Sequence, residues 1–137
     1  MTGPAARLVD RWRGGTTTDI GFLKNGFPRE TTAANYIGGV RTNFRMPDVM
    51  SIGVGGGSLV RVKPDSRTMT VGPDSAGAYP GPVCYGRGGL QPTVTDANLV
   101  LGRFPSGANL GGVALDADKA AQALDRIAAP LGITRDV

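Results

Sequence analysis

Histidine is absent from this chain of 137 residues, and cysteine and tryptophan occur once each. Without an imidazole there can be no Ser-His-Asp triad, no Cys-His pair and no histidine ligand for a metal. The single cysteine, Cys84, has no partner for an internal disulfide, and a zinc site built from one thiolate and carboxylates would be unusual. Chemistry with oxygen ligands, such as Mg²⁺ held beside a phosphate, remains open.

Long apolar runs are also missing. No window approaches the roughly 20 apolar residues of a membrane-spanning helix, and residues 1–15 lack the apolar centre of a signal peptide. We therefore expect no membrane partner. The single cysteine adds the expectation of a reducing compartment, and so of a cytoplasmic location.

The charge is mildly basic, with 15 Lys and Arg against 11 Asp and Glu and a formal net charge of +4. The arginines are scattered along the chain and form no block. Nucleic-acid binding normally needs a basic stripe, aromatic stacking or a known motif, so we expect no nucleic-acid partner. A small anionic ligand fits the scattered arginines.

Glycine is the most unusual part of the composition. Hydrophobic residues make up 40% and charged residues 19%, which is typical of a globular domain with one modest core. The chain nevertheless has 22 Gly and 10 Pro, many of them between Gly53 and Gly112. This concentration predicts turns and loops in which backbone approaches something closely.

Strands are predicted in the first half of the chain. Residues 18–23 are rich in β-formers, residues 24–26 form a turn and the chain returns from Phe27, which indicates a hairpin. Residues 49–54 predict a short buried strand that runs into a glycine loop. Residues 59–71 predict a second hairpin with a turn near its middle.

Two helices are predicted after a segment, residues 72–92, that is expected to be mostly loop. The first helix begins after Thr93 or Thr95 as N-cap and ends before Gly102. The second begins after Asp116. The order of hairpin, strand, hairpin, loop and helices is that of an α/β or α+β domain.

Two glycine-rich stretches are the main candidates for ligand contact. In the first, "GGTTTDIG", a tight glycine turn beside threonine hydroxyls can surround phosphate oxygens, and Asp19 either holds a Mg²⁺-bound water or caps the turn. The alternative is a simple turn that leads into a Thr-rich strand. The second, "SIGVGGGSLV", offers a backbone on which a nucleotide can lie. It is neither a P-loop nor a dinucleotide fingerprint.

Three further residues carry open alternatives. Cys84 is interpreted as a buried structural thiol, because a nucleophile would need a base that the chain does not have. Arg87, between glycines, is a candidate for contact with an anion. Asp96 is most simply part of a helix start, and the alternative is a metal-binding or catalytic carboxylate.

Together these stretches resemble the hydantoinase A / 5-oxoprolinase family. The resemblance rests on "GGTTTDIG", on "IGVGGGSLV" and, most specifically, on "VGPDSAGAYPGPVCYGRGGLQPTVTDANLVLGRF". It extends from Gly14 to about Ile133. We accordingly divide the chain into an unmatched segment, residues 1–13, and a partial domain of this family, residues 14–137.

The resemblance implies a partial actin/Hsp70-like ATPase lobe of the α/β class, with β-hairpins, glycine-rich loops and two C-terminal helices. It also implies ATP and Mg²⁺ as cofactors, with Asp19 as the residue that would contact the metal. Arg87, from its place between glycines, is a further candidate for contact with the nucleotide. Two sets of residues match the family's nucleotide-binding turns: Gly14, Gly15, Thr16, Thr17, Thr18 and Asp19, and then Gly55, Gly56, Gly57 and Ser58.

The departures from the family pattern are equally specific. Family members are several times longer, so the chain corresponds to an internal slice without the other ATPase lobe. The aspartate of the family's phosphate loop would fall at Trp12, and Arg13 replaces a small or apolar residue. We therefore expect a broken phosphate loop that lacks its carboxylate and its supporting strand.

The implied function is that of a fragment of an ATP-dependent hydrolase that opens cyclic amides of the hydantoin or 5-oxoproline type, inactive alone. One alternative is a non-catalytic nucleotide-binding or interaction module, completed by a separately encoded lobe or by a hydantoinase B-type subunit. Another is part of a ketone carboxylase subunit, since that branch shares the same motifs.

Overall fold

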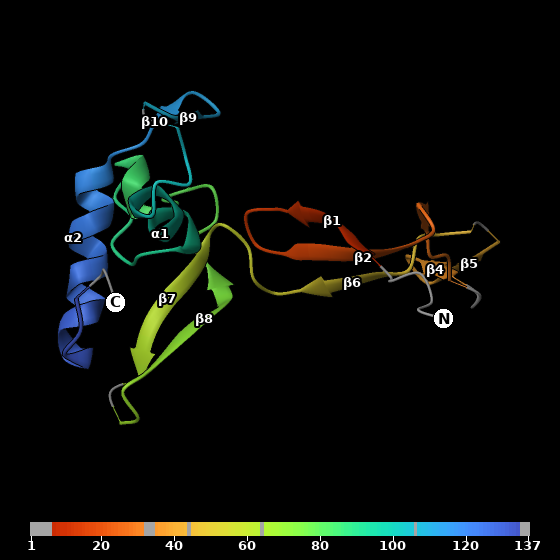
Figure 1. Cartoon of the computed structure of the whole chain (residues 1–137), viewed down its shortest axis with the longest axis horizontal. Helices are drawn as coiled ribbons and strands as arrows, with labels where there is room; N and C mark the ends of the chain where they lie inside the picture. Colours follow the sequence, from red (N-terminus) through yellow and green to blue (C-terminus); the bar gives the residue numbers. More distant parts are fainter. Residues whose placement is uncertain (1–6, 32–34, 44, 64, 106, 135–137) are drawn as a thin grey trace. The chain divides into compact units, whose positions relative to one another are not determined.

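The computed structural model describes residues 7–31, 35–43, 45–63, 65–105 and 107–134. The chain divides into two compact units. The first unit consists of Met1–Arg13 and Thr18–Ile52, and the second of Gly14–Thr17 and Gly53–Val137. Figure 1 shows the elements of both in chain order.

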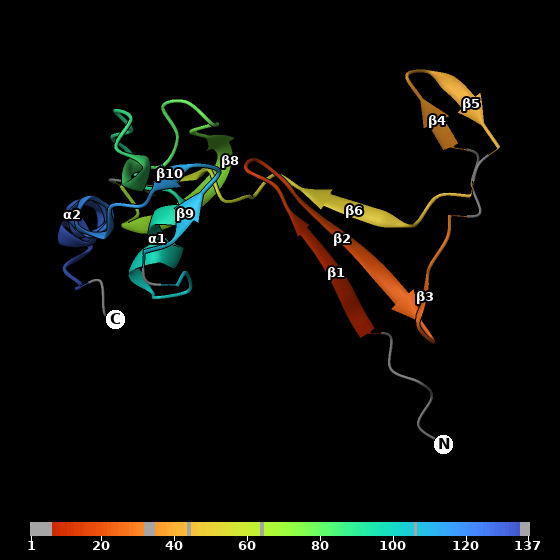
Figure 2. The ribbon, with the colours of Figure 1, turned by 90° about the horizontal axis from the view of Figure 1, so that it is seen from above.

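The first unit is built on an antiparallel sheet around strand β2 (Thr18–Lys24). Strand β1 (Arg7–Arg13) pairs along β2, β6 (Val49–Ile52) pairs with the first part of β2, and β3 (Phe27–Pro28) pairs with its last two residues. Figure 2 shows this arrangement from a second direction. A separate small hairpin joins β4 (Asn35–Ile37) to β5 (Val40–Thr42).

The first predicted hairpin is confirmed by the turn between β2 and β3. Asn25 and Gly26 both have positive φ, 53° and 83°. Two consecutive residues of this kind match the right-handed twist of the flanking strands, and Asn-Gly is the pair that adopts the conformation most easily.

Strand β1 corrects the expectation that the first glycine turn has no supporting strand. Although Trp12 and Arg13 depart from the family pattern, Trp12 pairs with Asp19 and Arg13 with Thr18 across the sheet. A ladder needs only backbone N–H and C=O groups, so a changed side-chain pattern does not prevent it. The side chains of Trp12 and Arg13 lie outside the described part of the structure.

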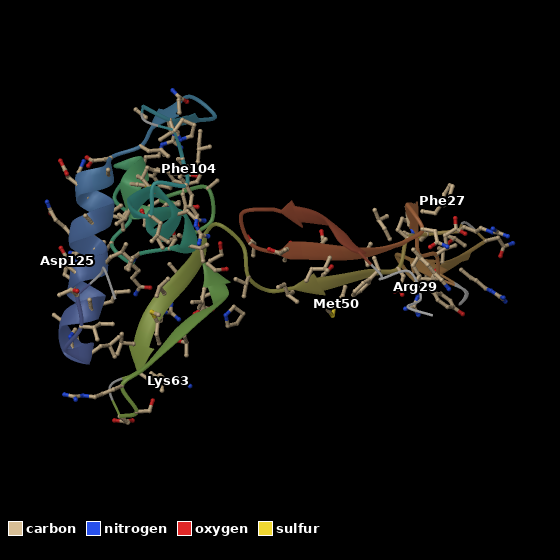
Figure 3. The ribbon with its side chains drawn as sticks, viewed as in Figure 1. Phe27, Arg29, Met50, Lys63, Phe104 and Asp125 are labelled. Carbon is tan, nitrogen blue, oxygen red and sulfur yellow. The ribbon has the colours of Figure 1, made fainter. Side chains whose placement is uncertain are left out.

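Strand β6 was expected to be buried, and this expectation is wrong. Val49, Met50 and Ile52 are 47%, 52% and 39% exposed, and Figure 3 shows Met50 standing out from the strand. The strand also ends at Ile52, before the predicted end at residue 54. A short apolar run indicates a strand but does not show whether another layer covers it.

The second unit begins with a longer hairpin, β7 (Ser58–Lys63) and β8 (Thr68–Ser75). Val60 pairs with Val71 and Val62 with Met69 across the predicted second hairpin. Strand β8 continues into the segment that was expected to be loop, because backbone pairing extends to Ser75 opposite Ser58. A 3₁₀ turn, η1 (Val83–Tyr85), follows.

Both predicted helices are present, as α1 (Val94–Val100) and α2 (Ala117–Ala128). Thr93 is the N-cap of α1, and Asp116 caps α2 by accepting a hydrogen bond from the backbone N–H of Lys119. A short strand pair, β9 (Asn109–Leu110) with β10 (Val113–Ala114), lies between the helices in the chain, and a 3₁₀ turn, η2 (Ala129–Leu131), follows α2.

The core of the second unit is small. Helix α2 packs against α1 and η1, and its buried positions are alanines. The buried hydrophobic residues are Val60, Val83, Cys84, Ala120, Ala123 and Ala128. Among the described residues, no helix is both long and apolar enough to cross a membrane.

Candidate nucleotide site

The two predicted glycine loops come together in the second unit. We call Gly14–Thr17 the first glycine turn and Gly55–Ser58 the second glycine turn. The N–H of Gly56 donates to the carbonyl of Gly14 at 3.1 Å, and the N–H of Gly57 donates to the carbonyl of Gly15 at 2.6 Å. Residues some forty positions apart are therefore joined by backbone hydrogen bonds.

The second glycine turn needs glycine because the first turn lies directly against it. A Cβ on Gly55 would lie 2.6 Å from the carbonyl oxygen of Gly14, and a Cβ on Gly57 would lie 2.8 Å from the carbonyl oxygen of Gly15. Side-chain carbons do not tolerate such distances. The sequence predicted that something lies close to these glycines. In this structure, the group that lies against them is the backbone of the first glycine turn.

The N–H groups of the second glycine turn are all used within the protein. Besides the two bonds to the first turn, the N–H of Gly55 donates to Ser58 Oγ at 2.8 Å, and the N–H of Ser58 donates to the carbonyl of Gly55 at 3.1 Å. Ser58 is fully buried. The second glycine turn is therefore a rigid support with no backbone donor left over.

The first glycine turn is different, because it keeps free donors at the surface. Its ends are closed by the N–H of Gly14, which donates to the carbonyl of Thr17 at 2.9 Å. The N–H groups of Gly15, Thr16 and Thr17 donate to no described residue, and all three residues are exposed. Successive free N–H groups in a turn form a concavity that binds anions.

Space is also open around the first glycine turn. A Cβ on Gly15 would meet nothing within 4 Å, and the hydroxyl of Thr16 donates to Ser75 Oγ at 3.4 Å. A phosphate could thus reach the backbone at Gly15 with threonine hydroxyls beside it.

The remaining residues of the first motif lie on β2 in the first unit. Thr18 is buried, and Asp19 accepts a hydrogen bond from Ser51 Oγ on the neighbouring strand β6. Within the described ranges, no group of three or more His, Cys, Asp or Glu could hold a metal ion by itself. Magnesium commonly takes only one or two carboxylates and completes its shell with phosphate and water oxygens. The metal contact of Asp19 stays a prediction.

Arg87 lies on the loop after η1, between Gly86 and Gly88, which have φ of 65° and 92°. It is exposed, and it forms no ion pair with any acidic side chain among the residues that the structure describes. Burial raises the pKa of Tyr85, and the charge of Arg87 opposes that rise. Its predicted contact with an anion is still a prediction.

Asp96 is a buried carboxylate that accepts four hydrogen bonds from side-chain and backbone donors. The side chain is fully buried and accepts from the backbone N–H groups of Val83 at 3.2 Å, Cys84 at 2.7 Å and Thr93 at 2.8 Å, and from the Thr93 hydroxyl at 2.8 Å. Both carboxylate oxygens are occupied. The helix-start interpretation of Asp96 is confirmed, because the side chain is buried and three of its four hydrogen bonds go to one carboxylate oxygen and the fourth, from Cys84, to the other.

The first turn of α1 also holds the second glycine turn. Thr95 donates from both its N–H and its hydroxyl to the carbonyl of Gly56, each at 2.8 Å. Thr95 and Asp96 thus connect α1 to two separate loops. The sequence reasoning missed these supporting roles, although the capping-box spacing from Thr93 to Asp96 was a usable signal.

Cys84 is a structural thiol, as predicted. It is fully buried, and burial, followed by its contact with Asp96, raises the pKa of the thiol well above its usual range. A thiol held protonated in this way is a poor nucleophile.

The fold matches solved ATP-dependent enzymes over most of the chain. An acetone carboxylase solved without nucleotide, in a study of ATP-dependent acetone carboxylation, aligns with a TM-score of 0.71 at 31% identity, covering 92% of this chain and 18% of that one. The ATP-dependent caprolactamase from Pseudomonas jessenii aligns with a TM-score of 0.70 at 45% identity, covering 90% of this chain and 18% of that one. The expected class, a partial α/β ATPase-like lobe, is therefore confirmed.

The sequence comparisons define the family. Residues 9–136 match the hydantoinase/oxoprolinase family, and the chain belongs to it. It is 47% identical to the caprolactamase subunit alpha of P. jessenii over 126 residues and 42% identical to the acetophenone carboxylase gamma subunit of Aromatoleum aromaticum over 122 residues. It covers 17% of the length of each of these relatives. The proposed division of the chain after residue 13 stays a prediction.

Proposed function

We propose that this chain forms the phosphate-contacting part of an ATP-dependent enzyme that opens cyclic amides of the hydantoin or 5-oxoproline type. The observation that carries the proposal is the first glycine turn, whose exposed N–H groups are held in place by the second glycine turn. The chain covers a small share of its relatives, and it is proposed to be inactive alone.

Each turn has its own part in this function. The N–H groups of Gly15, Thr16 and Thr17 would donate to phosphate oxygens, since they have no described acceptor. The second glycine turn would fix the position of the first, because its own donors are used. Positioning of this kind supplies much of the rate enhancement in phosphoryl transfer.

Magnesium and ATP enter as implied cofactors. When bound, Mg-ATP supplies the phosphoryl group that activates an amide or enolate oxygen, and the metal neutralises phosphate charge. Asp19 is proposed to orient a metal-bound water, and Ser51 would hold its carboxylate in one orientation. Arg87 remains a proposed contact for the nucleotide.

A thermal melt with and without millimolar Mg-ATP tests the nucleotide site. A ligand at 100 times its dissociation constant raises stability by about 2.7 kcal/mol, a shift of several degrees for a domain of this size. The Gly15→Val variant should melt like the parent without ligand, since its Cβ meets nothing within 4 Å. It should lose the shift with Mg-ATP, because the added side chain blocks the first glycine turn.

The matched control is Gly21→Val, which also places a Cβ where nothing lies within 4 Å. Gly21 is on β2, outside the first glycine turn, so this variant should keep the Mg-ATP shift. An equal loss of the shift in both variants, or no shift in the parent, would contradict the proposed site.

The enzymatic part of the proposal needs a longer polypeptide. The matching segment of the P. jessenii caprolactamase subunit alpha can be replaced by this chain, with which it is 47% identical over 126 residues. We expect the chimera to retain ATP-dependent lactam hydrolysis, and Gly15→Val within it to abolish that activity. A folded chimera that binds Mg-ATP but never hydrolyses a lactam would contradict the assignment to amide opening.

A second candidate is a non-catalytic nucleotide-binding or interaction module, completed by a separate lobe or by a hydantoinase B-type subunit. The chain could instead be part of a ketone carboxylase. Both relatives reported above are named as subunits, and one of them is an acetophenone carboxylase subunit. Co-expression with the neighbouring reading frames tests this candidate. A stable complex that binds Mg-ATP without any lactam or ketone turnover would favour the module, and turnover of a ketone would favour the carboxylase.

A further inference from the structure

Ser75, the last residue of β8, lies beside the first glycine turn although it is 59 positions away from Thr16 in the chain. Its hydroxyl oxygen accepts a hydrogen bond from Thr16 Oγ1 at 3.4 Å and another from the N–H of Gly77 at 3.1 Å. A serine hydroxyl has two lone pairs and one proton. Both lone pairs are therefore used, and the proton is donated to no residue that the structure describes.

The second glycine turn fixes the position of Ser75. Ser75 pairs with Ser58 at the end of the β7–β8 ladder, and the N–H of Ala76 donates to the carbonyl of Gly57 at 2.8 Å. A Cβ on Gly57 would lie 2.8 Å from Ser75 Oγ, so glycine at this position leaves the room that the hydroxyl occupies. The second glycine turn thus holds Ser75 and the first glycine turn at the same time.

The spacing of the two hydroxyls suits an acceptor that they share. An O–H···O hydrogen bond usually measures about 2.7–2.8 Å, so the 3.4 Å between Thr16 Oγ1 and Ser75 Oγ is a weak link. Two donors at this separation can both lie about 2.8 Å from a single oxygen atom. The N–H groups proposed to bind phosphate, those of Gly15, Thr16 and Thr17, belong to the same turn as one of these hydroxyls.

The charge next to Ser75 does not oppose an anion, because it is neutralised. The carboxylate of Asp74 is paired with the guanidinium of Arg61. A hydrogen bond from a neutral hydroxyl to an ionised phosphate is charge-assisted and about twice as strong as a neutral one. Phosphate is therefore a suitable acceptor for the proton of Ser75.

We infer that Ser75 is a phosphate-binding residue, whose hydroxyl donates to the phosphate that the first glycine turn holds. The inference rests on the proposed function, and it adds the end of β8 to the nucleotide site. Binding of the phosphate itself needs no nucleoside, so inorganic tripolyphosphate can serve as the probe.

The test is a calorimetric titration of the purified chain with tripolyphosphate. Ser75→Ala should weaken binding by at least about tenfold, the effect of losing one hydrogen bond to a charged group. Ser75→Thr keeps the hydroxyl and should retain most of the affinity. Ser66→Ala is the matched control, because Ser66 is exposed in the turn before β8 and its hydroxyl is bonded to Thr68 Oγ1 at 2.6 Å. Equal affinity in the parent and Ser75→Ala, or an equal loss in Ser66→Ala, would overturn the inference.

A second pair of variants separates direct contact from an effect through Thr16. In a Thr16→Val background the hydroxyl that donates to Ser75 is gone. We expect Ser75→Ala to weaken tripolyphosphate binding further in that background. No further loss would mean that Ser75 acts only by holding Thr16, and the phosphate contact would be wrong.

The unsubstituted chain gives a measurement that does not depend on the folding of a variant. Tripolyphosphate should shift the ¹H–¹⁵N NMR amide signals of residues 15–17 and also those of residues 75–77. Shifts at residues 15–17 without any at residues 75–77 would contradict the inference.

Failure of this inference can be told apart from failure of the proposed function. An Mg-ATP melting shift of equal size in the parent and Ser75→Ala counts against Ser75 only. Tripolyphosphate binding that depends on Ser75, in a chain whose melt does not move with Mg-ATP, counts against the nucleotide proposal only. No binding of either ligand contradicts both.

Discussion

Replacing Asp96 by alanine is expected to abolish cooperative unfolding of the second unit. The substitution leaves three backbone N–H groups without an acceptor, those of Val83, Cys84 and Thr93. An unsatisfied buried donor costs about 1–3 kcal/mol, so the loss totals about 3–9 kcal/mol. Small domains have about 5–15 kcal/mol of stability in all.

Asp96→Asn is the more informative variant because it keeps the shape of the side chain. The asparagine oxygen can still accept from Thr93, but its NH₂ group then faces the N–H of Cys84, which donates to the other carboxylate oxygen in the parent. Losing that bond, and the negative charge that strengthens the others, should cost about 2–4 kcal/mol.

Urea denaturation followed by circular dichroism measures the loss, and the reaction of Cys84 with a thiol reagent reports on the same region. Asp118→Asn, at an exposed position on α2, should change stability by less than about 0.5 kcal/mol. The reasoning is refuted if Asp96→Asn unfolds within 1 kcal/mol of the parent, on the order of a single neutral hydrogen bond, while Cys84 stays protected.

Three further predictions concern other parts of the second unit. Gly55→Ala should destabilise by about 1–3 kcal/mol, because its Cβ would lie 2.6 Å from a carbonyl oxygen of the first glycine turn, whereas Gly15→Ala should be neutral in the same melt. The pKa of Cys84 is raised on folding, so the folded state holds a proton that the unfolded thiol releases above its ordinary pKa of about 8.5. The free energy of unfolding should therefore fall by about 1.4 kcal/mol per pH unit above that value. Cys84→Ala should remove this slope. The backbone N–H groups in the first turn of α2 lower the pKa of Asp116. The Asp116 cap should therefore stabilise the helix at pH values above the ordinary aspartate pKa of about 3.9, and this stabilisation should be lost as the pH falls through the lowered pKa. Circular dichroism of the helix should show this loss in the parent and not in Asp116→Asn, since asparagine caps without titrating.

Local signals in the sequence predicted the elements well where one residue type has one conformational use. Asn25 and Gly26 predicted the β2–β3 turn, and Thr93 and Asp116 predicted the starts of both helices. In each case the hydrogen bonds or the φ angles that decide the structure lie within four residues. The prediction therefore needed no knowledge of distant parts of the chain.

The candidate site was predicted less completely because its geometry depends on distant residues. The glycines at 55–57 were predicted to offer a backbone to a nucleotide, and the sequence could not show that the backbone of Gly14 and Gly15 lies against them. The prediction that β6 is buried was wrong for the same reason, because burial depends on whether distant parts of the chain cover the strand. The supporting role of Thr95 depends on a carbonyl 39 positions away.

Hydrogen bonds from several loops converge on Thr95 and Asp96 in the first turn of α1. In the stretch that identifies this chain most specifically, Asp96 serves an architectural role, since it accepts hydrogen bonds from the backbone of Val83, Cys84 and Thr93. A search keyed to this stretch therefore groups proteins by a shared scaffold.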